Sequence, residues 1–152
     1  MIKILFVCHG NICRSPMAEF VMRDLLNKSG RSAEIASAAT STEELGNSVY
    51  PPARRKLSEH GISCDGKTAR QMTKRDYEYY DFIIAMERYN LRNMTRFVGD
   101  DPEGKVSLLL DWTDSPGDVA DPWYTGDFET TYRDVEKGCR GLLEKLVADG
   151  RI

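Results

Sequence analysis

The sequence of 152 residues contains only two histidines and four cysteines, and this scarcity excludes several classes of protein. Neither His9 nor His60 has the spacing to a cysteine that a zinc site requires, so we expect no metal ion, and we expect no other cofactor. Four cysteines are also too few for the disulfide framework of a small secreted domain. We therefore expect free thiols and a reducing, cytoplasmic location.

Long apolar runs and concentrated positive charge are absent too. No segment approaches the ~20 apolar residues of a membrane span. Lys3 interrupts an N-terminal apolar run that is only as long as a strand, which argues against a signal peptide. The net charge is -3, and no basic patch with interleaved aromatic residues indicates nucleic-acid binding. We expect neither a membrane nor a nucleic acid as partner.

The composition is that of an ordinary globular protein, with 41% hydrophobic and 30% charged residues. A chain of this length can form one domain with a full hydrophobic core. We therefore expect residues 1–152 to form a single domain, and we expect a monomer. Acidic residues are concentrated between positions 100 and 129, and we interpret most of them as a solvated loop surface.

Hydrophobic periodicity predicts strands that alternate with helices. Strands are expected over residues 2–7, 33–38, 81–86 and 106–110, and helices over 15–28, 51–60, a turn after Thr73, 87–95 and from 127 onward. Residues 111–126 are expected to form a long loop. This alternation predicts an α/β fold, a doubly wound four-stranded parallel sheet of order 2-1-3-4 with helices on both faces.

The segment Cys8-His9-Gly10-Asn11-Ile12-Cys13-Arg14-Ser15 joins the first strand to the first helix. Ligands bind at such junctions in open α/β sheets, and the free N–H groups of a helix N-terminus attract anions. Arg14 adds a planar fork that can hold two oxygens of one phosphate. Below the anion, Cys8 would be a thiolate, favoured by the helix dipole, the loop N–H groups and Arg14.

Three further loop residues have expected backbone or hydrogen-bonding roles. Ser15 can donate to the sulfur of Cys8, and it is also expected to cap the first helix, with Pro16 as the first helical residue. Gly10 and Asn11 suit backbone positions with positive φ. His9 is expected to line the mouth of the pocket rather than to act as a base.

The stretch from Val7 to Glu19, VCHGNICRSPMAE, resembles the low-molecular-weight protein tyrosine phosphatase family. It combines the C-x5-R-[ST] pattern of cysteine-dependent phosphatases with the flanking strand and helix that the pattern needs. The resemblance implies a doubly wound fold and hydrolysis of phosphotyrosine and aryl phosphate monoesters through a phosphocysteine. The implied phosphate-binding loop consists of His9, Gly10, Asn11, Ile12, Cys13 and Ser15, around the catalytic Cys8 and Arg14.

The leaving group also needs a proton, because a phenol has a pKa of ~10 and its anion leaves poorly at neutral pH. By residue type alone, any of four acids could serve: Asp111, Asp114, Asp118 and Asp121. Pro122 holds Asp121 extended and stiffens the loop. The segment Asp121-Pro122-Trp123 resembles the general-acid loop of the family, and this resemblance selects Asp121.

Aromatic residues after this acid are expected to form the substrate rim. Trp123 and Tyr124 would line the cleft and stack on an aryl ring. On the opposite rim the resemblance places Glu43, after the segment SAATS at residues 37–41, where many members have another residue. It also implies that Ser37 supports Asn11, and that Lys67 occupies the place of a histidine that supports the same asparagine in some members.

The remaining cysteines have two interpretations. The resemblance implies a reversible disulfide between Cys13 and Cys8 that protects the nucleophile during oxidation. Alternatively, Cys13 is a small packed thiol, as free cysteines often are. Cys64 and Cys139 are expected to be ordinary buried residues.

The leading functional interpretation is a protein tyrosine phosphatase whose partners are phosphotyrosine-containing proteins. One alternative is an arsenate reductase of similar fold, which needs two further cysteines on a mobile segment. Residues 65–138 contain no cysteine, which argues against it. The second alternative is a non-catalytic phosphate-binding module, and the presence of both Cys8 and Asp121 argues against that.

Overall fold

The computed structural model describes residues 1–152, whose four strands form one parallel sheet in the order β2-β1-β3-β4. The strands are β1 (Lys3–Cys8), β2 (Glu34–Ala39), β3 (Phe82–Ala85) and β4 (Val106–Leu108). β1 lies at the centre and pairs in parallel with β2 on one side and with β3 on the other. The expected fold class and strand order are confirmed.

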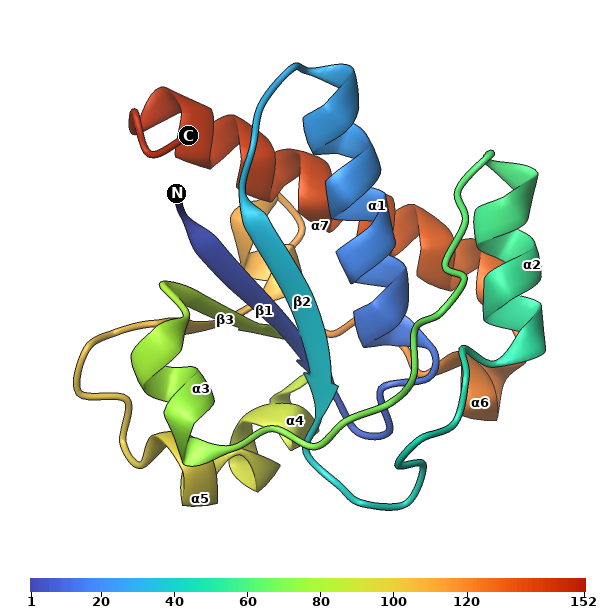
Figure 1. Ribbon diagram of the computed structural model, residues 1–152, viewed down its shortest axis with the longest axis horizontal. Coiled ribbons are helices and arrows are strands. Elements are labelled where there is room, and N and C mark those ends of the chain that lie inside the picture. The colour runs from blue at the N-terminus through green and yellow to red at the C-terminus, as the bar shows by residue number, and fades with distance from the viewer.

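Helices follow the strands as the alternation predicts (Figure 1). They are α1 (Arg14–Lys28), α2 (Pro51–Glu59), α3 (Lys74–Tyr79), α4 (Arg88–Asn93), α5 (Thr95–Val98), α6 (Pro122–Thr125) and α7 (Phe128–Ala148), with a 3-10 helix, η1 (Leu109–Trp112), after β4. No helix is both long enough and apolar enough to cross a membrane.

The side chains of β1 alternate between two hydrophobic cores, because successive strand residues point to opposite faces of a sheet. Ile4 and Phe6 pack with α1, α2 and α7 on one face, whereas Leu5 and Val7 pack with α3 and α5 on the other. Figure 1 shows α1 and α7 side by side on one side of the sheet and α3 and α5 on the other. Burial on both faces explains why the strand is a continuous apolar run.

The fourth strand is shorter than the expected 106–110, because the chain turns into η1 after Leu108. The carboxylate of Asp111 accepts a hydrogen bond from the amide of Leu108 at 3.2 Å, which closes the turn. Two glycines of α7 let η1 come close: a Cβ on Gly138 would lie 2.3 Å from Leu109 Cγ, and one on Gly141 would lie 2.2 Å from the Trp112 oxygen.

Two short helices were not expected. The predicted helix over 87–95 is divided into α4 and α5, and α5 extends beyond it to Val98. The expected loop over 111–126 contains α6, whose first turn is capped by Asp121, since its Oδ1 accepts a hydrogen bond from the Trp123 amide at 3.0 Å. Thr73 does precede a helix as predicted, and Asp76 accepts a hydrogen bond from its amide at 2.8 Å.

Candidate active site

The loop between β1 and α1 forms the floor of a cavity of about 420 Å³ at the carboxyl edge of the sheet. This is the place where open α/β sheets bind ligands. The lining residues predicted from the sequence are Cys8, His9, Gly10, Ile12, Cys13, Arg14, Glu43, Asp121, Trp123 and Tyr124. The other three predicted residues, Asn11, Ser15 and Ser37, are buried and do not line the cavity.

The sulfur of Cys8 is surrounded by hydrogen-bond donors at the bottom of the cavity. Its Sγ lies 2.9 Å from Ser15 Oγ and accepts a hydrogen bond from the Asn11 amide at 3.3 Å. Ser15 Oγ accepts a hydrogen bond from Asn11 Nδ2 at 2.8 Å, which leaves the hydroxyl proton of Ser15 for the sulfur. The predicted contact of Ser15 with Cys8 is confirmed.

The prediction that Ser15 caps α1 is wrong. The helix begins at Arg14, with Cys13 at the cap position, so Ser15 lies inside the first turn and its hydroxyl is turned toward the sulfur. In addition, the amides of Gly10, Ile12, Cys13 and Arg14 donate no hydrogen bond within the protein. These amides belong to a helix N-terminus and its loop, where free donors and the helix dipole favour an anion.

Asn11 holds the loop from behind. It has a φ of 60 and is 1% exposed. Its Nδ2 donates to Ser15 Oγ at 2.8 Å and to Ser37 Oγ at 2.9 Å, while its Oδ1 accepts from the Arg70 amide at 3.2 Å. The expected positive φ of Asn11 is confirmed. The expected positive φ of Gly10 is wrong. A glycine at this position instead leaves room for Glu44, because a Cβ added to Gly10 would lie 3.3 Å from Glu44 Cγ.

A buried charged network supports Ser37 in turn. Its hydroxyl donates to Glu19 Oε1 at 2.6 Å, and Lys67 Nζ donates to the Ser37 carbonyl at 3.0 Å. Lys67 Nζ also lies 3.4 Å from Glu19 Oε1. Burial lowers the pKa of Lys67, and the nearby Glu19 carboxylate opposes that shift. Lys67 therefore supports the loop through Ser37 and not by direct contact with Asn11.

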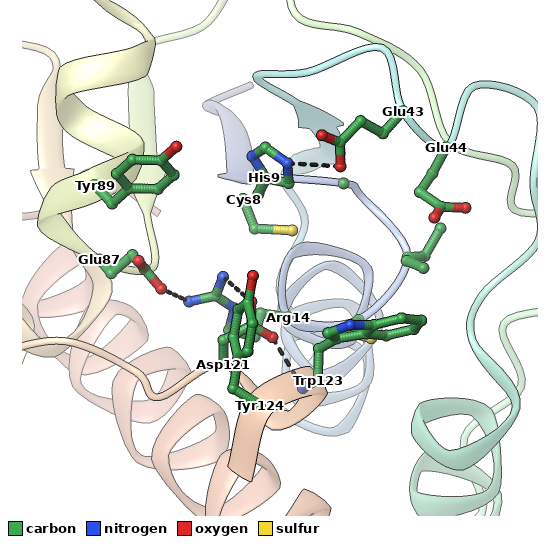
Figure 2. A pocket seen from close by; sticks show the side chains of 13 residues that line it. Cys8, His9, Arg14, Glu43, Glu44, Glu87, Tyr89, Asp121, Trp123 and Tyr124 are labelled. Carbon is green, nitrogen blue, oxygen red and sulfur yellow. Dashed lines mark hydrogen bonds and ion pairs between the residues drawn. The ribbon is translucent and has the colours of Figure 1, made fainter. Parts of the chain in front are cut away.

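Arg14 is 2% exposed, and three oxygens hold its guanidinium. Nη1 donates to Glu87 Oε2 and, at 2.9 Å, to the Val119 carbonyl, while Nη2 donates to Asp121 Oδ2 at 3.3 Å. Burial alone would lower the pKa of Arg14, but the charges of Cys8, Asp121 and Glu87 raise it above its usual value. The cation is therefore permanent and has a defined orientation toward the cavity (Figure 2).

Asp121 is the only one of the four candidate acids that lines the cavity. Asp118 instead pairs with Arg88 at 3.6 Å and Asp114 with Lys137 at 3.0 Å, while Asp111 closes the turn into η1. The carboxyl group of Asp121 has one oxygen on Arg14 and the other on the Trp123 amide. The short helix α6 thus places this acid at the cavity wall, 3.3 Å from the cation.

The rim is aromatic on one side and acidic on another. Trp123 is 57% exposed and Tyr124 is 85% exposed, and both line the cavity. The ring of Tyr50 lies 5.0 Å from that of Trp123, centroid to centroid, and supports it from behind. Glu43 Oε2 lies 2.9 Å from Nε2 of His9, which lines the cavity mouth as expected (Figure 2).

The sequence reasoning missed three lining residues, Glu44, Glu87 and Tyr89. Glu87 follows β3 at the same edge of the sheet as Cys8, so the predicted strand order already placed it beside the loop. Glu44 follows the predicted rim residue directly. Nothing in the sequence indicated that Tyr89 lines the cavity, because its position depends on where α4 begins.

All four cysteines are free and buried. Burial, with a smaller effect of the neighbouring Cys8, raises the pKa of the Cys13 thiol to about 12. Cys64 and Cys139 do not line the cavity, and the Cys139 thiol donates to the Ala18 carbonyl at 3.6 Å. These two are the ordinary buried residues that the sequence predicts, so Cys8 and Cys13 alone have access to a ligand.

Comparison with known proteins gives one consistent match. Residues 3–151 match the sequence model of the family described as low molecular weight phosphotyrosine protein phosphatase. A Bacillus subtilis protein, low molecular weight protein-tyrosine-phosphatase YfkJ, is 39% identical over 150 residues, covering 96% of each chain. The low molecular weight phosphotyrosine protein phosphatase of Gallus gallus is also 39% identical over 150 residues, covering 94% of each chain.

Solved structures agree with the sequence matches. The crystal structure of YfkJ from Bacillus subtilis superimposes with a TM-score of 0.93 at 39% identity and covers 98% of this chain and 96% of that one. A protein tyrosine phosphatase from Entamoeba histolytica, crystallised with Hepes in its active site, has a TM-score of 0.89 at 26% identity and covers 100% of both chains.

Proposed function

Because the chain belongs to the low molecular weight phosphotyrosine protein phosphatase family and is a protein tyrosine phosphatase, we propose that Cys8, Arg14 and Asp121 carry out its reaction. One observation carries this assignment. A thiol, a guanidinium and a carboxyl group line the same cavity, at the point where the loop amides have no acceptor in the protein. That set matches the three needs of phosphate ester cleavage: a nucleophile, an anion site and a proton donor.

Cys8 attacks phosphorus in line with the ester oxygen. The S–P bond forms as the P–O bond to the phenol breaks, and Asp121 gives its proton to the departing oxygen. The equatorial phosphate oxygens are held by the free loop amides and by Arg14, which stabilise the charge of the transition state. The product is a phosphocysteine on Cys8 and a neutral phenol.

Water then hydrolyses the phosphocysteine. Asp121, now a carboxylate, takes a proton from the attacking water as the P–S bond breaks, which returns the thiolate and releases inorganic phosphate. Ser15 and the Asn11 amide stabilise the sulfur as a leaving group, because both contact Sγ. No redox step occurs, and the acid is protonated again at the end of the cycle.

Substrate binding changes the surroundings of Asp121. The guanidinium of Arg14 holds the carboxylate at 3.3 Å, and the phosphate dianion competes for the same donors. Binding therefore displaces Asp121 from Arg14 and leaves its Oδ2 free to approach the leaving oxygen. Asp121 can then donate its proton to the leaving oxygen.

The decisive experiment varies the leaving group in Asp121→Asn. We expect kcat/KM to fall by about 10²–10⁴-fold for phosphotyrosine and much less for an aryl phosphate with an acidic phenol, because only the basic oxygen needs the proton. Asp118→Asn is the matched control, since Asp118 pairs with Arg88 outside the cavity. A uniform fall across leaving groups would remove Asp121 from the role of general acid.

A Cys8→Ser variant separates enzyme from binding module. We expect it to lose turnover while still binding vanadate, since the amides and Arg14 supply most contacts to the anion. Turnover within tenfold of the wild type would exclude Cys8 as the nucleophile. A phosphate-release assay with and without thiol reductant distinguishes hydrolysis from the reductase alternative, because hydrolysis consumes no thiol.

The setting of this activity is part of the proposal. Residues 1–152 form one domain that acts as a monomer in the cytoplasm on phosphotyrosine-containing proteins. The single sheet with its two cores and the family match over residues 3–151 support one domain. Size-exclusion chromatography with light scattering tests the monomer, and a dimer mass at micromolar concentration would contradict it.

A further inference from the structure

The mouth of the cavity has opposite charges on its two sides. Glu43 and Glu44, from the loop after β2, lie on one side of Cys8, and Tyr89 from α4 lies on the other (Figure 2). The guanidinium of Arg92 is 5.7 Å from the centre of the Tyr89 ring, which places this cation on the Tyr89 side. A ligand that crosses the mouth and extends past Tyr89 therefore passes from carboxylates at one end toward the guanidinium of Arg92, which does not itself line the cavity.

The acidic side has no lysine or arginine within salt-bridge distance. Glu44 Oε2 accepts a hydrogen bond from Asn47 Nδ2 at 2.7 Å, a neutral partner, and no cation lies within salt-bridge distance of Glu44. Glu43 is bonded to His9 and its side chain is 69% exposed. Two adjacent carboxylates without a lysine or arginine partner leave negative potential on this side.

On the opposite side, the two arginines of α4 differ in whether an acidic residue pairs with them. Arg92 is exposed and forms no ion pair, while its neighbour Arg88 is compensated by Asp118 at 3.6 Å. Glu87 and Asp121 do not cancel this charge, because both are bound to Arg14 in the interior of the cavity. On the two sides of the mouth, Glu44 and Arg92 thus have no ion-pair partner, and Glu43 is bonded to His9.

We propose that this polarised mouth selects phosphotyrosine segments that carry a cationic residue on the Glu44 side and an anionic residue on the Arg92 side. The proposal rests on the proposed function, since the phosphotyrosine ring must enter the cavity above Cys8. An extended chain advances ~3.3 Å per residue, so residues one to three positions from the phosphotyrosine cross the two sides of the mouth. Complementary charges there orient the peptide.

Two peptides of identical composition test this most sharply. One has two arginines before the phosphotyrosine and two glutamates after it, and the other has the reverse order. Net charge, ring and leaving group are the same, so any difference in kcat/KM reports the direction of charge alone. We expect one peptide to be preferred by roughly threefold to tenfold, as two exposed charge contacts allow, and the preference to shrink in 0.5 M salt.

Single and double variants test whether Glu44 and Arg92 cause the preference for one peptide. Glu44→Gln and Arg92→Gln should each move the ratio of the two kcat/KM values toward one, and the double variant should remove most of it. Glu144→Gln on α7 and Arg31→Gln beyond the C-terminal end of α1 are matched controls, because both are exposed and lie away from the cavity. These controls should keep the wild-type ratio.

The outcomes separate this inference from the proposed function. Equal hydrolysis of both peptides by the wild type, dependent on Cys8, would overturn the polarised mouth and leave the phosphatase mechanism standing. A preference that survives in the double variant would also overturn it. If neither peptide nor a small aryl phosphate is hydrolysed, both the mechanism and the inference fail.

Discussion

Replacing Asn11 by alanine tests how the phosphate loop holds its shape. The residue is 1% exposed, has a φ of 60, and makes three side-chain hydrogen bonds, to Ser15, Ser37 and the Arg70 amide. Alanine keeps none of these bonds, and its Cβ disfavours a left-handed backbone. The variant therefore loses three hydrogen bonds that hold the loop and adds strain to its backbone.

The magnitude follows from those contacts. Each buried hydrogen bond contributes about 1 kcal/mol, and a left-handed alanine costs about 1 kcal/mol more than an asparagine that tolerates this region. Allowing for relaxation of the loop, we expect Asn11→Ala to lower the free energy of unfolding by about 2–4 kcal/mol. For a chain of this size that corresponds to a fall in Tm of roughly 5–15 °C.

Two further variants divide the effect. Asn11→Gly also loses the hydrogen bonds but tolerates positive φ, so it should be more stable than Asn11→Ala by about 0.5–1 kcal/mol. Asn47→Ala is the control, because Asn47 is exposed and bonds only to Glu44 through its side chain; it should change stability by less than about 0.5 kcal/mol. Urea unfolding measures all three, and kcat/KM for an aryl phosphate should fall at least tenfold in Asn11→Ala.

The reasoning would be refuted if Asn11→Ala unfolded within 0.5 kcal/mol of the wild type. Such a result would mean that the loop keeps its shape through its other contacts. Equal stability of the alanine and glycine variants would refute the backbone part alone, because φ would then carry no cost.

Three other predictions concern packing, oxidation and pH. Gly138→Ala should destabilise the protein by about 1–3 kcal/mol in thermal unfolding despite the higher helix propensity of alanine, because the new Cβ would lie 2.3 Å from a leucine Cγ of η1. Mild peroxide should inactivate the enzyme reversibly, as Cys8 is oxidised to a sulfenic acid and Cys13 displaces water to form a disulfide; Cys13→Ser should make the loss irreversible, as peptide mapping would show. Burial raises the pKa of Asp101, but hydrogen bonds from a tyrosine hydroxyl and two amides outweigh burial and lower it overall. The Asp101 carboxylate therefore stabilises the fold at any pH above its unfolded pKa. This stabilisation is lost as the pH falls through the lower pKa of the folded state. Asp101→Asn should therefore show a flatter fall of unfolding free energy below about pH 4.

Each of these has a contrary result. A Gly138→Ala Tm equal to that of the wild type would mean that η1 moves away freely. Sulfinic acid on Cys8 with Cys13 unmodified would exclude the disulfide. Parallel acid limbs for Asp101→Asn and the wild type would mean that the carboxylate has the same proton affinity folded and unfolded.

Local sequence patterns predicted the elements and contacts around Cys8 better than the residues at which helices and strands begin and end. The strand, loop and helix around Cys8 lie within one continuous stretch, so the elements and the buried sulfur contact with Ser15 could be predicted from neighbouring residues. Ser15 was also expected to cap α1, and that failed because the helix already begins at Arg14, so Ser15 lies inside its first turn. Residue type alone does not show which partner it has.

Features that depend on two distant segments were missed. The run from Val106 to Leu110 is apolar throughout, and nothing within it shows that Leu109 turns away from the strand to meet a glycine of α7. Glu87 reaches Arg14 only because β3 lies beside β1. The turn at Leu109 requires knowledge of packing, which periodicity does not contain, whereas the predicted strand order already placed Glu87 beside the loop and left only the reach of its side chain unknown.

Cys8 is the last residue of the central strand and part of the larger hydrophobic core. Opening of β1 requires loss of its pairing with β2 along Lys3–Cys8 and with β3 along Ile4–Val7, so the amides of β1 should exchange with solvent only through near-global unfolding. The residues that line the rim of the cavity, such as Glu43 and Tyr124, are exposed and can open locally at far lower cost. The proposed nucleophile therefore stays in place for as long as the protein is folded, while the rim segments can move, or change in sequence, without disturbing it.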